Sequence, residues 1–163
     1  MKRAIFIGQA MPRYKGTPHD WKSLNLWLYS IGITDDLIKK YFYYSALVDY
    51  FPGAKGSSHR VPSKSEIQNE RNRLINAITR FAPQIVVPVG KLSISYCLNT
   101  RVGKLEEFVG KKYLTNPYQA LNSTCAVIPF PHPSGASTWR HKETNKDLLK
   151  KALKLLKSEL LKK

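Results

Sequence analysis

Four short apolar runs are spaced widely along the chain, and each has the composition of a β-strand. They cover residues 4–8, 41–48, 85–90 and 124–130, and they are rich in β-branched or aromatic side chains. Runs with so few polar residues are typical of strands that are buried on both faces of a sheet. The pattern therefore predicts four strands in the interior of the protein.

Helix-like stretches separate these runs. They cover residues 21–31, 34–40, 63–81 and 91–99, and a last one lies within residues 142–163, where leucines recur at helical spacing. Ser63 and Glu66 have the spacing of a capping box, and Pro83 predicts the end of the helix that follows. The alternation of strands and helices predicts an α/β fold with parallel strands and helical crossovers.

Loops that follow parallel strands meet at one edge of the sheet, where ligands of open α/β folds bind. Four parts of the chain meet this condition, namely residues 9–20, 49–62 and 131–140 and the single residue Lys91. Residues 50–62 are rich in glycine, proline and serine and predict an irregular loop. We expect the candidate site to lie among these parts.

Charge narrows the class of partner. The chain has 163 residues, a length that fits one domain over 1–163. It has 27 Lys and Arg but only 11 Asp and Glu, which gives a net charge of +16. Residues 142–163 supply 8 Lys and 3 acidic residues, so the rest of the chain keeps a net charge of +11. Nucleic acid is the leading partner, and a solvated lysine-rich surface is the alternative interpretation.

Other features exclude several classes of protein. Cys97 and Cys125 are too few and too far apart for a zinc site or an iron–sulfur cluster, so we expect both to be buried and expect no metal and no cofactor. No apolar run approaches the roughly 20 residues that span a bilayer, and residues 1–8 are too short for a signal peptide. We expect a cytoplasmic protein.

The segment around His132 carries the clearest candidate chemistry. Pro131 and Pro133 restrict the backbone on both sides of the histidine and favour one side-chain orientation. The residues that follow offer hydroxyl groups and close backbone approach for a phosphate, and they are Ser134, Gly135 and Ser137. The alternative is a rigid turn with an incidental histidine.

The first strand ends in Gly8, which lets a ligand approach the strand end. The residues after it are Gln9-Ala-Met-Pro-Arg13. They lack the three glycines of a dinucleotide fingerprint and the pattern of a P-loop, so those two classes of site are unsupported.

In combination, these motifs resemble the uracil-DNA glycosylase superfamily over most of the chain. The first family motif is similar to Gly8-Gln-Ala-Met-Pro-Arg13, and the second to His132-Pro-Ser-Gly-Ala-Ser137. Between them lie Ser45-Ala-Leu-Val-Asp-Tyr-Phe-Pro-Gly53, Pro62, Glu66 and Ile85-Val-Val-Pro-Val-Gly-Lys91, in the order of the thermostable iron–sulfur branch. The resemblance implies a three-layer α/β/α sandwich with a central, mainly parallel four-stranded sheet.

The resemblance also implies a reaction. Members of this superfamily rotate a damaged nucleotide out of the DNA stack and hydrolyse its N-glycosidic bond, which leaves an abasic site. His132 would donate a hydrogen bond to the departing base, and removal of such a donor costs about 10² to 10³ in rate. Gln9 would recognise the base and orient water, beside Gly8.

Departures from the family pattern affect the predicted base pocket. Ala10 replaces an aspartate of the uracil-specific branch, although the iron–sulfur branch also has alanine there. Ser45 stands in place of the base-recognising asparagine and cannot present both an amide donor and an acceptor, which puts strict uracil selectivity in doubt. The stacking phenylalanine falls near His19, so His19 or Trp21 would stack on the base, unless Trp21 packs in the core.

The DNA-facing side departs as well. In the uracil-specific branch a larger apolar residue fills the space that the flipped base leaves, and Ala136 stands at its position. Trp139 or Arg140 would then fill this space by stacking. The alternative for Trp139 is that it packs on the protein. The cluster-binding cysteines of the iron–sulfur branch are missing. Phosphate contacts are predicted at Ser134, Ser137, Arg140, Lys91 and Lys55. Arg13 and Arg60 are either backbone contacts or surface charges.

Two functions therefore stand at this point. The first is a monofunctional, monomeric DNA glycosylase acting on uracil, hypoxanthine, xanthine or a bulky modified pyrimidine of the kind made by phages, in DNA repair or in defence. The second is a DNA-binding module on the same scaffold that recognises a modified base or an abasic site without turnover. A covalent attack of His132 on the sugar, as in one branch of the superfamily, ranks last because no matching loop insertion is found.

Overall fold

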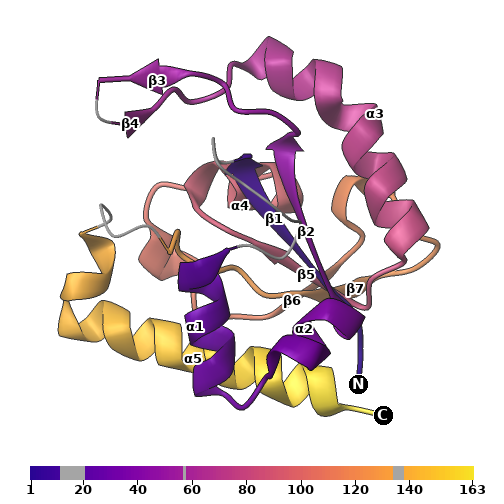
Figure 1. Ribbon diagram of the computed structural model, residues 1–163, viewed down its shortest axis with the longest axis vertical. Coiled ribbons are helices and arrows are strands. Elements are labelled where there is room, and N and C mark those ends of the chain that lie inside the picture. The colour runs from indigo at the N-terminus through magenta and orange to yellow at the C-terminus, as the bar shows by residue number, and fades with distance from the viewer. Residues whose placement is uncertain (12–20, 57, 134–137) are drawn as a thin grey trace.

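A five-stranded sheet forms the middle of the structure, a computed structural model that describes residues 1–11, 21–56, 58–133 and 138–163 (Figure 1). The strand order is β2-β1-β5-β7-β6. The four predicted strands form its parallel part, as β1 (Ala4–Ala10), β2 (Phe42–Val48), β5 (Ile85–Pro88) and β7 (Cys125–Val127). The α/β fold and its parallel strands are confirmed.

The expected number of four strands is wrong by one. β6 (Tyr113–Thr115) pairs antiparallel with β7 and forms an edge of the sheet. Its residues are partly or fully exposed, so the strand lacks the apolar run by which the other four were recognised. A second, two-stranded antiparallel sheet, β3 (Ala54–Lys55) with β4 (Ser58–His59), lies within the predicted irregular loop.

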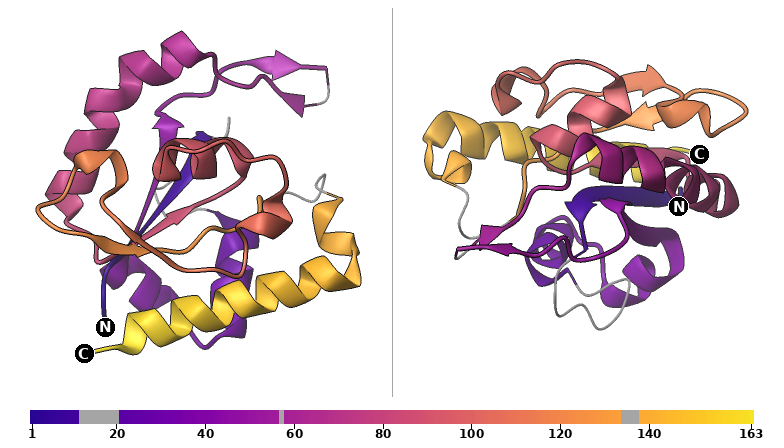
Figure 2. Two further views of the ribbon diagram at one scale, coloured as in Figure 1. Left: turned by 180° about the vertical axis from the view of Figure 1, so that it is seen from behind. Right: turned by 90° about the horizontal axis from the view of Figure 1, so that it is seen from above.

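Helices cover both faces of the main sheet. α1 (Lys22–Ser30), α2 (Asp35–Tyr41) and α5 (Glu143–Leu161) bury apolar residues in one core cluster with Phe6 and Tyr44, while α3 (Lys64–Phe81) packs in a second cluster with Ile5 and Ile7. α4 (Lys91–Leu98) contributes to both clusters. The sheet passes between α3 and α5 in two opposite views (Figures 1 and 2). This is the three-layer arrangement that the family resemblance implies.

Local signals placed the helices well. The side chain of Ser63 accepts a hydrogen bond from the Glu66 amide and the Glu66 carboxylate accepts one from the Ser63 amide, so the capping box is formed. α3 ends at Phe81 and is capped by Ala82, which has a φ of +50° and precedes Pro83. Short 3₁₀ helices complete the described secondary structure, at Leu105–Glu107 (η1), Pro117–Gln119 (η2) and Trp139–His141 (η3).

The amino-terminal edge of the sheet lies near both chain ends. The Lys2 amide donates to the carbonyl of Leu160 at 2.9 Å, and the two ends lie close together in each view of Figure 2. The carboxyl ends of the parallel strands therefore lie on the opposite side, below the β3–β4 hairpin (Figure 1).

Candidate active site

The carboxyl ends of the parallel strands lie side by side, as expected. The Gly90 amide donates to the carbonyl of Phe130 at 2.9 Å, and Val89 forms a parallel bridge with Phe130. The Met11 amide donates to the carbonyl of Tyr50 at 3.3 Å. The residues that follow β1, β2, β5 and β7 thus form one edge, which we call the carboxyl edge.

His132 is an exposed side chain on this edge. Pro131 and Pro133, its neighbours in the chain, are buried, so the two prolines anchor the backbone on both sides of the histidine. A Cβ atom on Gly90 would lie 3.8 Å from Cβ and 4.0 Å from Cδ2 of His132, so the imidazole lies close to this glycine. Gly90 caps the N-terminus of α4 with a φ of +88°. His132 is therefore an exposed imidazole beside the N-terminus of α4, whose first N–H groups have no acceptor within the helix.

Gly8 accommodates a protein side chain at the end of β1. A Cβ atom on Gly8 would clash with Cη2 of Trp21, so the indole ring lies against the glycine. The same ring stacks on Tyr44, with 5.5 Å between the ring centroids and 26° between the planes. We expected a ligand to use the space at Gly8, but Trp21, packed against the core, occupies it.

The other predicted residues of β1 are placed at the carboxyl edge. Gln9 and Ala10 are half-buried, and Ala10 is in register with Val48 of β2. The buried hydroxyl of Ser93 donates to the carbonyl of Ile7 at 2.5 Å, which fixes the first turn of α4 against β1. Sequence reasoning missed Ser93, because nothing in the local pattern marks a bond between residues 86 positions apart.

Ser45 lies on the face of the sheet opposite to Trp21, another predicted base-binding residue. It is 2% exposed, and its hydroxyl accepts a hydrogen bond from Nη1 of Arg73 on α3 at 3.2 Å. Nη2 of the same arginine donates to the carbonyl of Ala46 at 2.7 Å. Because successive side chains of a strand point to opposite faces, Ser45 faces α3 while Tyr44 and its partner Trp21 lie on the other face. Ser45 thus positions Arg73 in this structure and does not meet Trp21.

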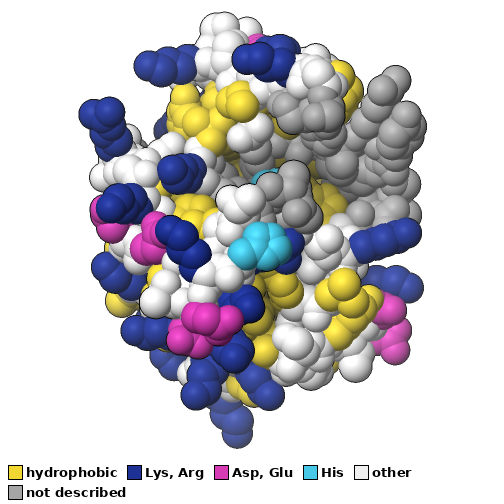
Figure 3. Space-filling view, turned by 90° about the vertical axis from the view of Figure 1, so that its left-hand side faces the viewer, with side chains coloured by type: hydrophobic (Ala, Val, Ile, Leu, Met, Phe, Trp, Pro, Cys, Tyr) yellow, Lys and Arg dark blue, Asp and Glu magenta, His cyan; other side chains and the backbone are white. Residues whose placement is uncertain are grey.

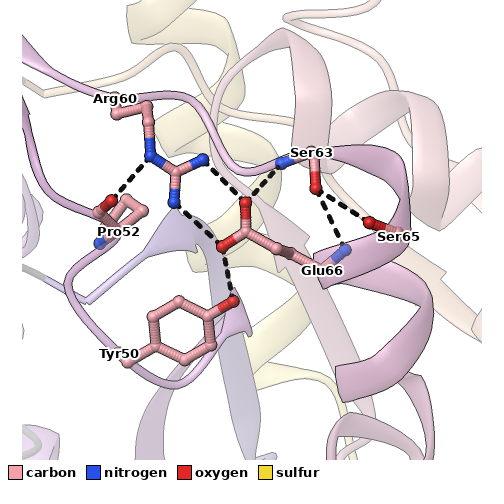
Figure 4. A network of polar contacts seen from close by, with 6 residues as sticks. All are labelled: Tyr50, Pro52, Arg60, Ser63, Ser65 and Glu66. Carbon is pink, nitrogen blue, oxygen red and sulfur yellow. Dashed lines mark hydrogen bonds and ion pairs between the residues drawn. The ribbon is translucent and has the colours of Figure 1, made fainter.

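A carboxylate, Glu66, holds the loop that follows β2 (Figure 4). Nη1 and Nη2 of Arg60 donate to its two oxygens at 2.7 and 3.0 Å, and the hydroxyl of Tyr50 donates at 2.6 Å. Nε of Arg60 donates to the carbonyl of Pro52 at 2.7 Å, and the capping-box amide of Ser63 completes the set. We call this network the Glu66 clamp. Arg60, predicted as either a backbone contact or a surface charge, is ion-paired with Glu66.

The Glu66 clamp has a clear electrostatic signature. The hydrogen bonds from Arg60, then Tyr50, then the Ser63 amide hold the pKa of the Glu66 carboxyl far below its usual value. Glu70, one turn along α3, accepts a hydrogen bond from the Asp49 amide at 2.8 Å. Two carboxylates of α3, Glu66 and Glu70, therefore attach both ends of the loop over residues 49–62. Only Glu66 was recognisable in the sequence, through the capping-box pattern.

Trp139 and Arg140 pack on the protein. Trp139 is half-buried against the core. The guanidinium of Arg140 lies 5.6 Å from the ring centroid of Trp27. The structure thus favours the interpretation that Trp139 packs on the protein, over a role as a wedge.

The predicted lysines lie on an exposed basic surface. Lys55 is exposed on the β3–β4 hairpin, and Lys91 is exposed as the first residue of α4, next to Gly90. Figure 3 shows the side of the molecule on which the hairpin lies, and lysine and arginine side chains are spread over it while acidic ones are few. Arg13 and five of the predicted site residues lie outside the described residues. These five are His19, Ser134, Gly135, Ala136 and Ser137.

The donor set does not fit the cluster of the iron–sulfur branch. Such a cluster needs four ligands, whereas this chain has only Cys97 and Cys125, both buried and free. Burial raises the pKa of the Cys125 thiol to about 11.

Across residues 1–11, 21–56, 58–133 and 138–163, no three His, Cys, Asp or Glu side chains lie together as possible metal ligands. None of the helices in these ranges has the length and apolar composition of a membrane span.

Comparison with known proteins agrees with this architecture. No curated protein matches the chain. The model of one family, described as the Uracil DNA glycosylase superfamily, matches residues 2–157. This match includes all five strands of the main sheet, the carboxyl edge and His132. The chain belongs to the uracil DNA glycosylase superfamily.

Proposed function

We propose that this protein is a DNA glycosylase that hydrolyses the N-glycosidic bond of a flipped-out deaminated or modified base and leaves an abasic site. Membership in the superfamily supports the class of reaction, and the net charge of +16 supports DNA as the partner. The observation that carries the proposal is the exposed imidazole of His132, held by two buried prolines beside the start of α4.

The chemistry requires a stabilised leaving group. The bond between the sugar C1′ and the base nitrogen breaks with both electrons going to the base, water adds its oxygen to C1′, and the proton released by the water ends on the departed base. The departing base therefore gains negative charge. A ring N–H of His132 donates to a base oxygen, and the N-terminal amides of α4 favour the same charge. Gln9, at the end of β1, recognises the base and orients the water.

The pocket is proposed to be less selective than a strict uracil pocket. Ser45 is turned toward Arg73, and Ala10 has no polar group, so neither can read the hydrogen-bonding edge of uracil. Deaminated purines and bulky modified pyrimidines remain in the proposed range, for repair or for defence against modified phage DNA. We propose that residues 1–163 act as one domain, as a monomer, in the cytoplasm.

One observation favours the alternative of a DNA-binding module without turnover. The ring of Trp21 occupies the space at Gly8 that a base would approach, and Tyr44 supports it from behind. A flipped base would have to displace or stack on this tryptophan. Binding of an abasic site needs no such space.

The experiment is base release from short single- and double-stranded DNAs that carry uracil, hypoxanthine, xanthine, hydroxymethylcytosine or glucosylated hydroxymethylcytosine. His132→Ala is compared with His141→Ala, an exposed histidine of η3 with no proposed role. We expect His132→Ala to lower the rate by about 10² to 10³ and the control to leave it unchanged.

Each outcome separates the hypotheses. Release of one base by the wild type, with loss only in His132→Ala, supports the glycosylase and names its substrate. Binding of every DNA with no release would overturn catalysis and favour the binding module. DNA that stays attached to the protein in a denaturing gel would overturn simple hydrolysis in favour of a covalent His132 adduct.

A further inference from the structure

A groove leaves the candidate site along the outside of α4. It has a volume of about 700 Å³ and runs between the start of α3 and the whole length of α4. The side chains that matter here are Lys64, Lys91, Tyr96, Asn99, Arg101 and Val102. Lys91 directly follows Gly90, beside which the ring of His132 lies, so one end of the groove meets the carboxyl edge.

The charge of this groove is uncompensated. Its three cations, Lys64, Lys91 and Arg101, are exposed, and no acidic residue is among the residues that line it. None of the three has an ion pair with a carboxylate within the described part of the chain. Two other hollows differ in having a carboxylate in their lining. The one beside α3 contains Asp49, and the one at the amino-terminal edge contains Glu159.

The floor of the groove is apolar and partly aromatic. Ile67, Leu92 and Val102 lie along it, and the ring of Tyr96 is half-buried there. Pro62 also lines the groove. Ser63 directly follows it and Arg60 lies two positions before it, and both belong to the Glu66 clamp, which holds this part of the wall in place. A duplex presents mainly phosphates to a protein surface, whereas an unpaired strand also exposes bases that can lie on apolar and aromatic side chains.

We propose that this groove binds the DNA strand that flanks the target nucleotide on one side, in unpaired form, with phosphates on the three cations and bases over Tyr96. The protein then favours single-stranded or locally unpaired DNA over a closed duplex. This inference rests on the proposed function for the identity of the target nucleotide. The groove itself is tested by binding alone.

The probe is a fluorescein-labelled thymidine oligonucleotide that carries one tetrahydrofuran abasic-site analogue. Thymidines are added on the 5′ side only or on the 3′ side only, and affinity is measured by anisotropy at several salt concentrations. We expect a gain from one of the two extensions, because the groove leaves the site in one direction. The double variant Lys64→Ser/Arg101→Ser should remove that gain and lower the salt slope by about 1.4, since each phosphate contact on a single strand contributes about 0.7.

The matched control removes the same charge elsewhere. Lys39→Ser/Lys154→Ser takes away two exposed cations, one in α2 and one in α5, and should keep most of the one-sided gain. Tyr96→Leu should weaken the gain without changing the salt slope, with thermal unfolding to check that the variant folds. Equal losses in the two double variants, an equal gain from both extensions, or the same gain in a duplex would overturn the proposal.

The two proposals fail separately. Loss of the one-sided gain in the groove variant, together with no base release from any DNA, would keep the groove and reject the glycosylase. Base release that depends on His132, together with unchanged binding in the groove variants, would keep the glycosylase and reject the groove.

Discussion

The two ends of the sheet use lysine and arginine in opposite ways. At the amino-terminal edge, Lys2, Lys112 and Lys162 lie 3.0, 3.2 and 3.1 Å from the carboxylate of Glu159, which is nearly buried. At the carboxyl edge, Lys64 and Lys91 have no carboxylate partner among the described residues, and Glu66 is taken up by Arg60. The lysines and arginines behind the high net charge therefore include side chains that pair with a carboxylate of the fold and side chains that remain available to a polyanion. Only their structural surroundings distinguish the two groups.

The largest effect that tests this comparison is expected from Glu159→Gln. Three lysines would lose their common partner, and we expect the free energy of unfolding at pH 7 to fall by about 2 kcal/mol. Glu159→Gln should leave DNA affinity unchanged, and urea denaturation with a parallel binding titration measures both quantities. Glu143→Gln, at an exposed pair with Lys146, is the control and should cost less than about 0.5 kcal/mol.

The same prediction has a defined pH dependence. The lysine hydrogen bonds, above all from Lys2, outweigh the opposing effect of burial and lower the pKa of Glu159 to about 2. A lowered folded-state pKa stabilises the protein above the unfolded value of about 4.5, and this contribution is lost as the pH falls toward 2. The difference between wild type and Glu159→Gln should therefore shrink over this range. A difference that is constant from pH 7 to pH 2 would contradict the ion-pair explanation.

A smaller effect is expected from single lysines taken from the two edges. Lys112→Ser should lower the free energy of unfolding by about 0.5 to 1 kcal/mol and leave the affinity for single-stranded DNA intact. Lys64→Ser should do the reverse and reduce the salt slope of binding by about 0.7 without a measurable loss of stability. If both variants lose the same affinity, the distinction between the two edges is wrong.

The smallest effect is local and concerns the Glu66 clamp. Glu66→Gln removes the ion pair with Arg60, so the loop over residues 49–62 should open more often while α3 keeps its cap at Ser63. Hydrogen exchange of the Arg60 amide, which donates to the Gly53 carbonyl at 2.8 Å, should become faster. Glu70→Gln serves as the comparison, since it should accelerate the Asp49 amide and spare that of Arg60.

Predictions from the sequence succeeded where the cause is local. Apolar runs predicted the four parallel strands, and the capping box of Ser63 and Glu66 predicted the start of α3 within one residue. β6 was missed because three half-exposed residues at an edge have no distinctive pattern. The same limit applies to Ser45, whose motif position suggested a base contact although its hydroxyl bonds to Arg73, 28 residues away.

The sequence by itself determined the α/β architecture, the excess of positive charge, the family resemblance and the candidate His132, because periodicity, composition and short motifs are properties of neighbouring residues. Only the tertiary structure decided that Trp21 lies against Gly8, that Arg60 pairs with Glu66, and which lysines pair with Glu159. These outcomes depend on which side chains packing brings within hydrogen-bonding distance across long sequence separations. A local sequence pattern does not show which distant residues will come into contact.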